Sequence, residues 1–188
     1  MRGLTSDPGN PGDAAGPGDS DANAIPGRVY VSILGRSGWA LLNTYYAVAR
    51  ERKYYPDSVY IVVEAPYRDQ SEPVVEGLRT ISGHFDFSPR IECIPVDQAS
   101  IVDVFRKVYN LIRSRKSAGA RVALDITPGR KAAVAGLLLP IKLDEIDFVF
   151  YLEIATTHDV AKPYQMIPRQ FHRLHDLKEQ AVRARNDT

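Results

Sequence analysis

The feature of the sequence that most constrains the fold is a regular alternation of two kinds of segment from residue 28 onward. Short runs rich in β-branched residues alternate with longer segments whose apolar residues recur at helical spacing. We expect strands at 29–34, 58–64, 90–95, 121–125 and 147–152. We expect helices at 38–53, 71–82, 101–116 (with Ser100 as N-cap) and 128–139, and a polar helix at 170–184. This order predicts an α/β, Rossmann-like fold in which helices flank a mostly parallel sheet.

The first 27 residues differ in composition from the rest of the chain. They hold 6 of the 13 Gly, 4 of the 13 Pro and 4 Asp, with little that is apolar beyond Leu4 and Ile25. Such a segment buries too little apolar surface to offset the entropy lost on ordering it. We therefore expect a disordered tail at 1–27 and one domain at 28–188. The tail carries one Arg against four Asp, so the net charge of +1 on the chain leaves +4 on the domain.

Cysteine content and hydropathy indicate the compartment. Cys93 is the single cysteine, which excludes an intramolecular disulfide and a multi-cysteine zinc site. No basic segment followed by an apolar one is present at the N-terminus, so no signal peptide is predicted. The longest apolar run, 132–141, is about half the length of a membrane span and contains Pro140. We expect a soluble, cytoplasmic protein that does not contact a membrane.

The loop after the first predicted strand has the composition of an anion-binding site. Ligands of open parallel sheets bind beyond the carboxyl ends of the strands. Gly35 and Gly38 permit a close backbone approach at the start of a helix, and Arg36 and Ser37 add a charge and a hydroxyl. Ser37 also suits a plain N-cap role. Trp39 either packs in the core or offers a surface on which a base can stack.

The loop after the fourth predicted strand has a similar composition, Thr127, Pro128, Gly129, Arg130 and Lys131. We expect Thr127 to be the N-cap and Pro128 the first residue of the next helix. Arg130 and Lys131 would then oppose the helix dipole, which favours a negatively charged partner over a merely solvated first turn. The first and fourth strands can be neighbours in a doubly wound sheet, so the two loops could face one pocket.

Several functional classes are disfavoured by what the sequence lacks. The Gly-x-Gly-x-x-Gly and Gly-x4-Gly-Lys-Ser/Thr fingerprints are absent, which disfavours nicotinamide enzymes and P-loop ATPases. The segment 35–38 is one residue short of the serine-hydrolase elbow, and no His is placed as its partner. His172 and His175 are three residues apart on the predicted last helix, but no third ligand accompanies them. We therefore predict neither a metal site nor a cofactor.

Three segments taken together, 34–39, 124–132 and 164–168, resemble the CRISPR-associated Rossmann fold (CARF) family. The most specific of them is 125–131, which is similar to the Asp-x-Thr-x-Gly-x-Lys motif that follows the fourth strand in that family. The resemblance spans most of 28–170. It implies a homodimer that binds cyclic oligoadenylate, the second messenger of type III CRISPR antiviral defence, in a cleft across the dimer axis. The apolar helix predicted after Lys131 suits such a dimer contact.

The resemblance leaves two functions open. A stand-alone ring nuclease would cleave the messenger, with cyclic tetra-adenylate as the expected ring, by metal-independent attack of a ribose 2′-hydroxyl that gives 2′,3′-cyclic phosphate products. In the ring nucleases it resembles, a Ser of the first loop and the motif Lys matter, and here these correspond to Ser37 and Lys131. The alternative is a non-catalytic sensor that acts through a partner protein. The ligand-binding residues expected in either case are Gly35, Arg36, Gly38, Trp39, Thr127, Pro128, Gly129, Arg130 and Met166.

The length of the chain favours one of these two functions. The Rossmann-like unit and one terminal helix use all 161 residues outside the tail, which favours the enzyme over a sensor fused to an effector. One terminal helix is also too little for a helix-turn-helix, so no stable DNA binding is expected. Within the pocket, Arg36, Arg130 and Lys131 would neutralise phosphates and Trp39 would stack on adenine. Met166 would line the pocket or pack against the core.

Overall fold

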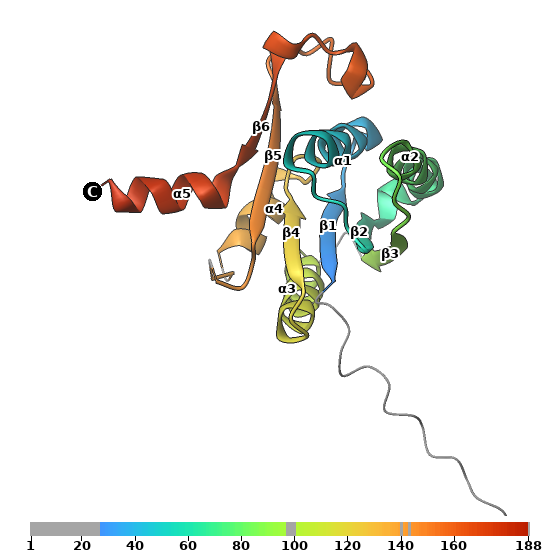
Figure 1. The fold of residues 1–188 in the computed structure, drawn as a ribbon. Helices are drawn as coiled ribbons and strands as arrows, with labels where there is room; N and C mark the ends of the chain where they lie inside the picture. Colours follow the sequence, from blue (N-terminus) through green and yellow to red (C-terminus); the bar gives the residue numbers. More distant parts are fainter. Residues whose placement is uncertain (1–26, 97–100, 140, 143, 188) are drawn as a thin grey trace, which may run out of the picture.

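The structure, a computed structural model, describes residues 27–96, 101–139, 141–142 and 144–187. Six strands form one sheet in the order β3-β2-β1-β4-β5-β6 (Figure 1). Their bounds are β1 Arg28–Leu34, β2 Ser58–Glu64, β3 Arg90–Val96, β4 Arg121–Asp125, β5 Phe148–Ile154 and β6 His172–Asp176. Neighbouring strands are parallel except β6, which is antiparallel to β5. The predicted α/β class is confirmed, whereas the predicted tail, Gly27 apart, lies outside the described residues.

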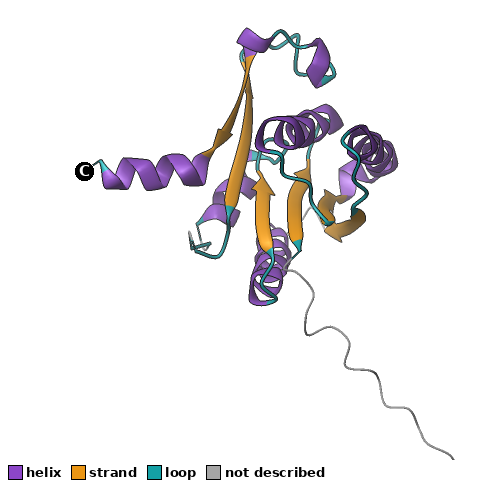
Figure 2. Ribbon diagram, in the orientation of Figure 1, coloured by secondary structure: helices purple, strands orange, loops and turns teal. Residues whose placement is uncertain are grey.

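Helices cover both faces of the sheet (Figure 2). The α-helices are α1 Gly38–Arg52, α2 Ser71–His84, α3 Ile101–Ser117, α4 Lys131–Leu138 and α5 Leu177–Asn186. Short 3-10 helices are η1 Ala65–Gln70, η2 Tyr164–Met166 and η3 Arg169–Phe171. One hydrophobic cluster joins α1 and α2 to the sheet, and a second joins α3 and α4 to the opposite face. α5 extends away from the body beyond β6 (Figure 2).

The central strands are nearly continuous apolar runs because both of their faces are covered. In β1, Val31 and Ile33 belong to the cluster under α3 and α4, while Tyr30 and Leu34 belong to the cluster under α1 and α2. The stripe predicted for the third helix is largely confirmed, with Val104, Val108 and Ile112 buried and Phe105 and Tyr109 half-buried. Ser100, its predicted N-cap, and the side chain of Ile101 lie outside the described residues.

The prediction of a single helix at 170–184 is wrong. The segment instead forms β6 and then α5, because Asp176 ends the strand and caps the helix, accepting hydrogen bonds from the backbone N–H groups of Lys178 (3.1 Å) and Glu179 (3.3 Å). The strand was missed since Leu174 is its one buried apolar residue. His172 and His175 therefore point to opposite faces of a strand, which removes the geometry that a helical metal pair would need.

Two further searches cover only the part of the chain that the structure describes. None of its helices combines the length and the apolar character needed to cross a bilayer. No group of three His, Cys, Asp or Glu side chains in it lies close enough together to hold a metal ion.

Candidate functional site

The loops that follow β1 and β4 touch each other at the carboxyl edge of the sheet. β1 and β4 are hydrogen-bonded neighbours, with Ser32 opposite Asp125. Gly35, just beyond β1, is buried, and a Cβ atom added to it would lie 1.9 Å from the carbonyl oxygen of Pro128. The backbones of the two loops are therefore in direct contact, and only glycine fits at this position. The two loops therefore meet at this edge, as the expected pairing of the first and fourth strands requires, and a ligand pocket that both face stays a prediction.

The first loop places Ser37 at the N-cap of α1. Its backbone is extended (φ −123°, ψ 111°), and its side chain makes no capping hydrogen bond. The hydroxyl is thus not used to hold the helix start, although the residue occupies the N-cap position. Arg36 beside it is exposed. Gly38 packs closely against α2, because a Cβ atom there would lie 2.8 Å from Val74 Cγ2 and the two helices would have to shift.

The second loop differs from its prediction. α4 begins at Lys131 with Arg130 as N-cap, and not at Thr127 and Pro128. The reason lies in how Thr127 is held. Its backbone N–H donates to Asp125 Oδ1 (2.9 Å), and its hydroxyl accepts from the backbone N–H of Leu152 on β5 (2.9 Å). The hydroxyl that would have capped a helix therefore accepts from β5, and the backbone of Thr127 is tied back to the end of β4. Gly129 packs against the new helix start, since a Cβ there would lie 2.7 Å from Val134 Cγ2.

Asp125, the last residue of β4, lies fully buried beneath this loop. It accepts hydrogen bonds from the Thr127 backbone and from Ser32 Oγ (3.0 Å). Burial raises the pKa of Asp125 to about 7, and the hydrogen bonds from Thr127 and Ser32 oppose the shift only in part. The sequence motif contains this residue, but sequence reasoning gave it no role. In the structure it anchors the backbone of the second loop.

Arg130 pairs with a carboxylate that sequence reasoning missed. Its Nε lies 3.1 Å from Glu64 Oε1, and its Nη2 lies 2.5 Å from Oε2. Glu64 is the last residue of β2 and its side chain is 0% exposed, whereas the Arg130 side chain is 39% exposed. Because β1 lies between β2 and β4, the pair spans the carboxyl end of β1. Arg130 therefore has the negatively charged partner that was expected, and this partner is Glu64. In the sequence, Glu64 stands out only as a charged residue at the end of the apolar run of β2.

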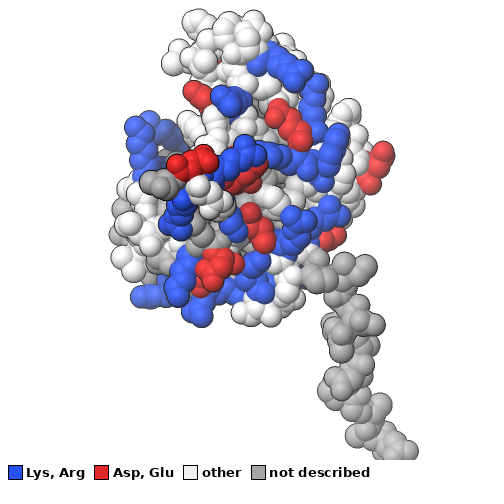
Figure 3. Space-filling model, turned by 60° about the vertical axis from the view of Figure 1, so that its left-hand side comes forward, with Lys and Arg blue, Asp and Glu red and all other residues white. Residues whose placement is uncertain are grey.

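Lys131, the first residue of α4, is exposed and forms no ion pair with any residue in the described ranges. Of the two interpretations offered for these cations, a solvated first turn therefore applies to Lys131, and a negatively charged partner applies to Arg130. Together with Arg36, Lys131 gives this edge two exposed cations. Figure 3 shows one face of the molecule, on which Lys and Arg side chains are interspersed with those of Asp and Glu.

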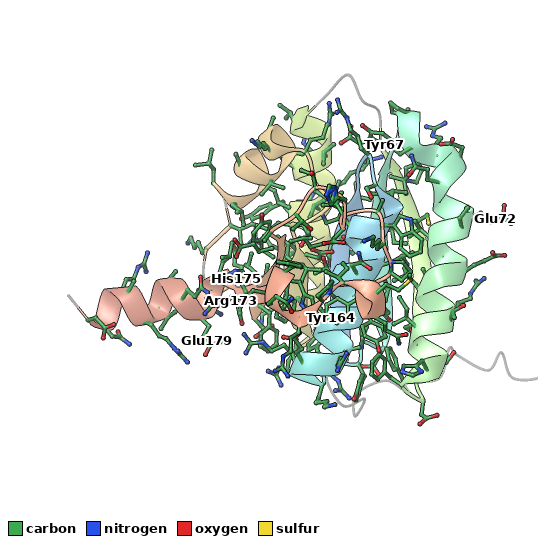
Figure 4. All side chains as sticks on the ribbon, turned by 90° about the horizontal axis from the view of Figure 1, so that it is seen from above. Tyr67, Glu72, Tyr164, Arg173, His175 and Glu179 are labelled. Atoms are coloured by element: carbon green, nitrogen blue, oxygen red, sulfur yellow. The ribbon has the colours of Figure 1, made fainter. Side chains whose placement is uncertain are left out.

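Trp39 directly follows the first loop on α1, and the residues just before Met166 line the same hollow as Trp39. Trp39 is 40% exposed, so the core alternative is wrong, and it lines a hollow of about 380 Å³ with Tyr46 and His84. Met166 is 66% exposed on η2. The residues around it contact the second half of α1, where Gln165 donates to Tyr46 Oη (2.7 Å). In Figure 4, Tyr164 lies over α1, well away from Tyr67 on η1 beyond the end of β2.

Comparisons with known proteins show the fold. No protein-family model matches the chain, and no curated protein matches it in sequence. Its structure is similar to Csm6 of Enterococcus italicus bound to cyclic hexa-2′-fluoro-hexa-dAMP, with a TM-score of 0.57 and 17% identity over 86% of this chain and 46% of that one. It is also similar to a type III CRISPR defence DNA nuclease activated by cyclic oligoadenylate, with a TM-score of 0.52 and 16% identity over 70% of this chain and 19% of that one. The chain thus spans less than half of each, and the likeness is one of a shared Rossmann-like fold.

Proposed function

We propose that this chain is a CARF-type domain that binds cyclic oligoadenylate at the edge formed by residues 35–38 and 127–131. The contact between Gly35 and Pro128 carries the proposal, because it joins two loops that each lead into a helix. Arg36 and Lys131 supply exposed positive charge beside these helix starts. The sequence motif at 125–131 and the fold shared with two proteins that bind or respond to such rings support the same ligand.

We further propose that the domain cleaves the ring. A ribose 2′-oxygen attacks the adjacent phosphorus, the bond from phosphorus to the 5′-oxygen breaks, and a 2′,3′-cyclic phosphate and a 5′-hydroxyl form. The 2′-hydroxyl proton leaves to water, and the departing 5′-oxygen takes up a proton. Lys131 stabilises the charge that develops on the phosphate, and Ser37, whose hydroxyl makes no capping bond, orients the attacking group. The reaction needs no metal, and cyclic tetra-adenylate is the proposed ring.

A homodimer would double this set of groups around a two-fold axis, which suits a ligand with repeated phosphates. The outward side of α4 supports a dimer, because Ala132 and Ala135 are exposed and Leu139, which follows the helix, is 86% exposed. Val102 on the neighbouring α3 is 58% exposed. Light scattering should give twice the chain mass, and Leu139→Glu should convert the protein to a monomer. A monomeric mass for the unmodified protein would contradict this part of the proposal.

The test of cleavage is incubation of the protein with cyclic tetra-adenylate in excess EDTA, with linear products followed by chromatography. Lys131→Ala and Ser37→Ala should each slow cleavage by about 100-fold, as the loss of a transition-state contact does. Matched controls are Lys142→Ala and Ser88→Ala, which remove the same side chains at exposed positions away from the two loops. Cleavage that survives both site variants would contradict the roles of Ser37 and Lys131.

A sensor without catalysis is the second candidate, and a specific observation favours it. One similar structure is of a nuclease that is activated by cyclic oligoadenylate, so the shared fold is compatible with signalling alone. Tight binding with the ring intact after many hours would select the sensor. Absence of binding to any cyclic oligoadenylate would contradict both candidates.

A further inference from the structure

A second, polar cleft lies at the far end of α1. It has a volume of about 650 Å³ and is formed by the last turn of α1 and by the segment 164–172, which folds back over that helix. Its charged and hydrogen-bonding walls include Arg50, Glu51, Tyr164, Arg169 and His172. We propose that this cleft binds a small ligand that carries a phosphate monoester, such as a mononucleotide.

The charges in the cleft favour such an anion. Arg50 comes from α1 and Arg169 from η3, so two arginines from different segments line the cleft, and both act electrostatically on His172. Neither forms an ion pair with any other residue that the structure describes. Glu51, the one carboxylate in the lining, already accepts a hydrogen bond from the Tyr164 hydroxyl. Guanidinium groups bind phosphate through paired N–H donors, and two of them match the two negative charges of a monoester.

His172 adds a polar group without a partner. Its ring packs against Tyr164 with 4.4 Å between the ring centroids, and its Nδ1 atom is buried without a hydrogen-bond partner in the described part of the chain. Burial lowers the pKa of His172, so the imidazole is neutral at neutral pH and can donate one hydrogen bond and accept another. Because His172 lines the cleft, its ring offers hydrogen-bonding capacity to a ligand hydroxyl or phosphate oxygen once the ring turns toward the cleft. A buried polar atom that lacks a partner is uncommon in folded proteins, and binding sites are where such atoms occur.

The wall of the cleft is fixed to α1, and the cleft lies far from Ser37, although it shares Tyr164 and Gln165 with the hollow beside Trp39. Tyr164 is buried, and its hydroxyl donates a hydrogen bond to Glu51. Its ring packs on Tyr46 with 5.1 Å between the ring centroids. Both contacts attach the segment 164–172, which forms one wall of the cleft, to α1. Arg50 lies thirteen positions after Ser37 along α1, which at 1.5 Å per residue is about 20 Å. The volume falls within the range of small-molecule sites. The two sites can therefore be tested independently.

The experiment is calorimetric titration of the full chain with inorganic phosphate and with adenosine 5′-monophosphate. Arg50→Gln and Arg169→Gln should each weaken binding of the monophosphate by about tenfold. Arg52→Gln is the matched control: it makes the same change on the same helix turn, but Arg52 points to Glu179 (3.3 Å) and does not line the cleft. Lys131→Ala should leave this binding unchanged.

Each contrary result is decisive. No saturable binding at about 10 mM ligand, a range in which even weak specific sites fill, would overturn the proposal. Equal weakening by Arg52→Gln would show a nonspecific charge effect and would also overturn it. Loss of binding in Lys131→Ala would place the anion at the edge of the sheet, which would overturn this proposal while supporting the proposed function.

Discussion

The carboxyl edge of the sheet and the cleft at the far end of α1 are built in different ways. The edge consists of two short continuous segments whose backbones touch at Gly35 and Pro128. The cleft consists of side chains from distant parts of the chain, and its central hydrogen bond joins Tyr164 to Glu51 across 113 positions. Local sequence can therefore indicate the edge, while the cleft exists only once the chain has folded.

The largest expected effect concerns the backbone contact at the edge. Gly35→Ala would force a Cβ atom against the Pro128 carbonyl, where no side chain can move aside. We expect the free energy of unfolding to fall by about 3 kcal/mol, measured by urea denaturation. Gly83→Ala is the control, because a Cβ there meets no atom within 4 Å and alanine favours a helix. Equal effects of the two variants would mean that the two loops do not depend on this contact.

A smaller effect is expected for the ion pair that spans β1. Arg130→Gln would leave the carboxylate of Glu64 buried without its cation, and should lower the free energy of unfolding by about 2–3 kcal/mol once the partial exposure of Arg130 is allowed for. Glu64→Gln should cost less, since the half-exposed guanidinium can turn to water. Unfolding of both variants under the same conditions gives the comparison. A larger loss for Glu64→Gln would contradict the assignment of the buried charge.

The buried carboxyl of Asp125 predicts a pH dependence. Its pKa is raised from 3.8 to about 7, so the folded protein holds a proton that the unfolded chain releases above about pH 4. The contribution of Asp125 to stability therefore falls as pH rises from about 4 through about 7. Relative to Asp125→Asn, the unmodified protein should lose about 2 kcal/mol between about pH 5 and about pH 8. A difference that stays constant over this range would contradict the raised pKa.

The smallest expected effect lies in the cleft. Tyr164→Phe removes the hydrogen bond to Glu51 but keeps the ring that packs on Tyr46 and His172. We expect the free energy of unfolding to fall by about 1 kcal/mol, measured by thermal or urea denaturation. Tyr67→Phe is the control and should change little, because Tyr67 lies on η1, well away from Tyr164 in Figure 4. A loss as large as that for Gly35→Ala would mean that the cleft, like the edge, holds the fold together.

Periodicity predicted most of the sheet correctly. The bounds of β2 and β4 match the prediction, since β-branched runs between turn residues are strong local signals. The start of α4 was wrong because the hydroxyl of Thr127 binds Leu152, a tertiary contact that local preference does not contain. A helix was predicted in place of β6, because a single buried apolar residue, Leu174, gives too little alternation of apolar and polar residues to distinguish a strand from a helix.

The two loops of the candidate site were predicted, while the residues that support them were not. Gly35 and Lys131 stood out by residue type and by their place after a strand. Glu64 and Asp125 support the second loop through an ion pair and a hydrogen bond, and their burial depends on the neighbouring strands. The buried side chains that hold a loop in place are therefore the residues of a site that are hardest to predict from the sequence alone.

The pairing of Arg130 with Glu64 has a consequence for ligand selection. An anion that broke the pair would leave the carboxylate of Glu64 buried without its cation. A monovalent ion such as chloride is therefore expected to compete poorly with Glu64 for the guanidinium of Arg130. The paired geometry still leaves the Nη1 hydrogens of Arg130 free of Glu64, so a ligand can be bound without breaking the pair. In the proposed complex, a ring that presents several phosphates at once would use those hydrogens together with Arg36 and Lys131. For the proposed cyclic oligoadenylate, this pairing would favour binding of the ring with its several phosphates over binding of small salt anions.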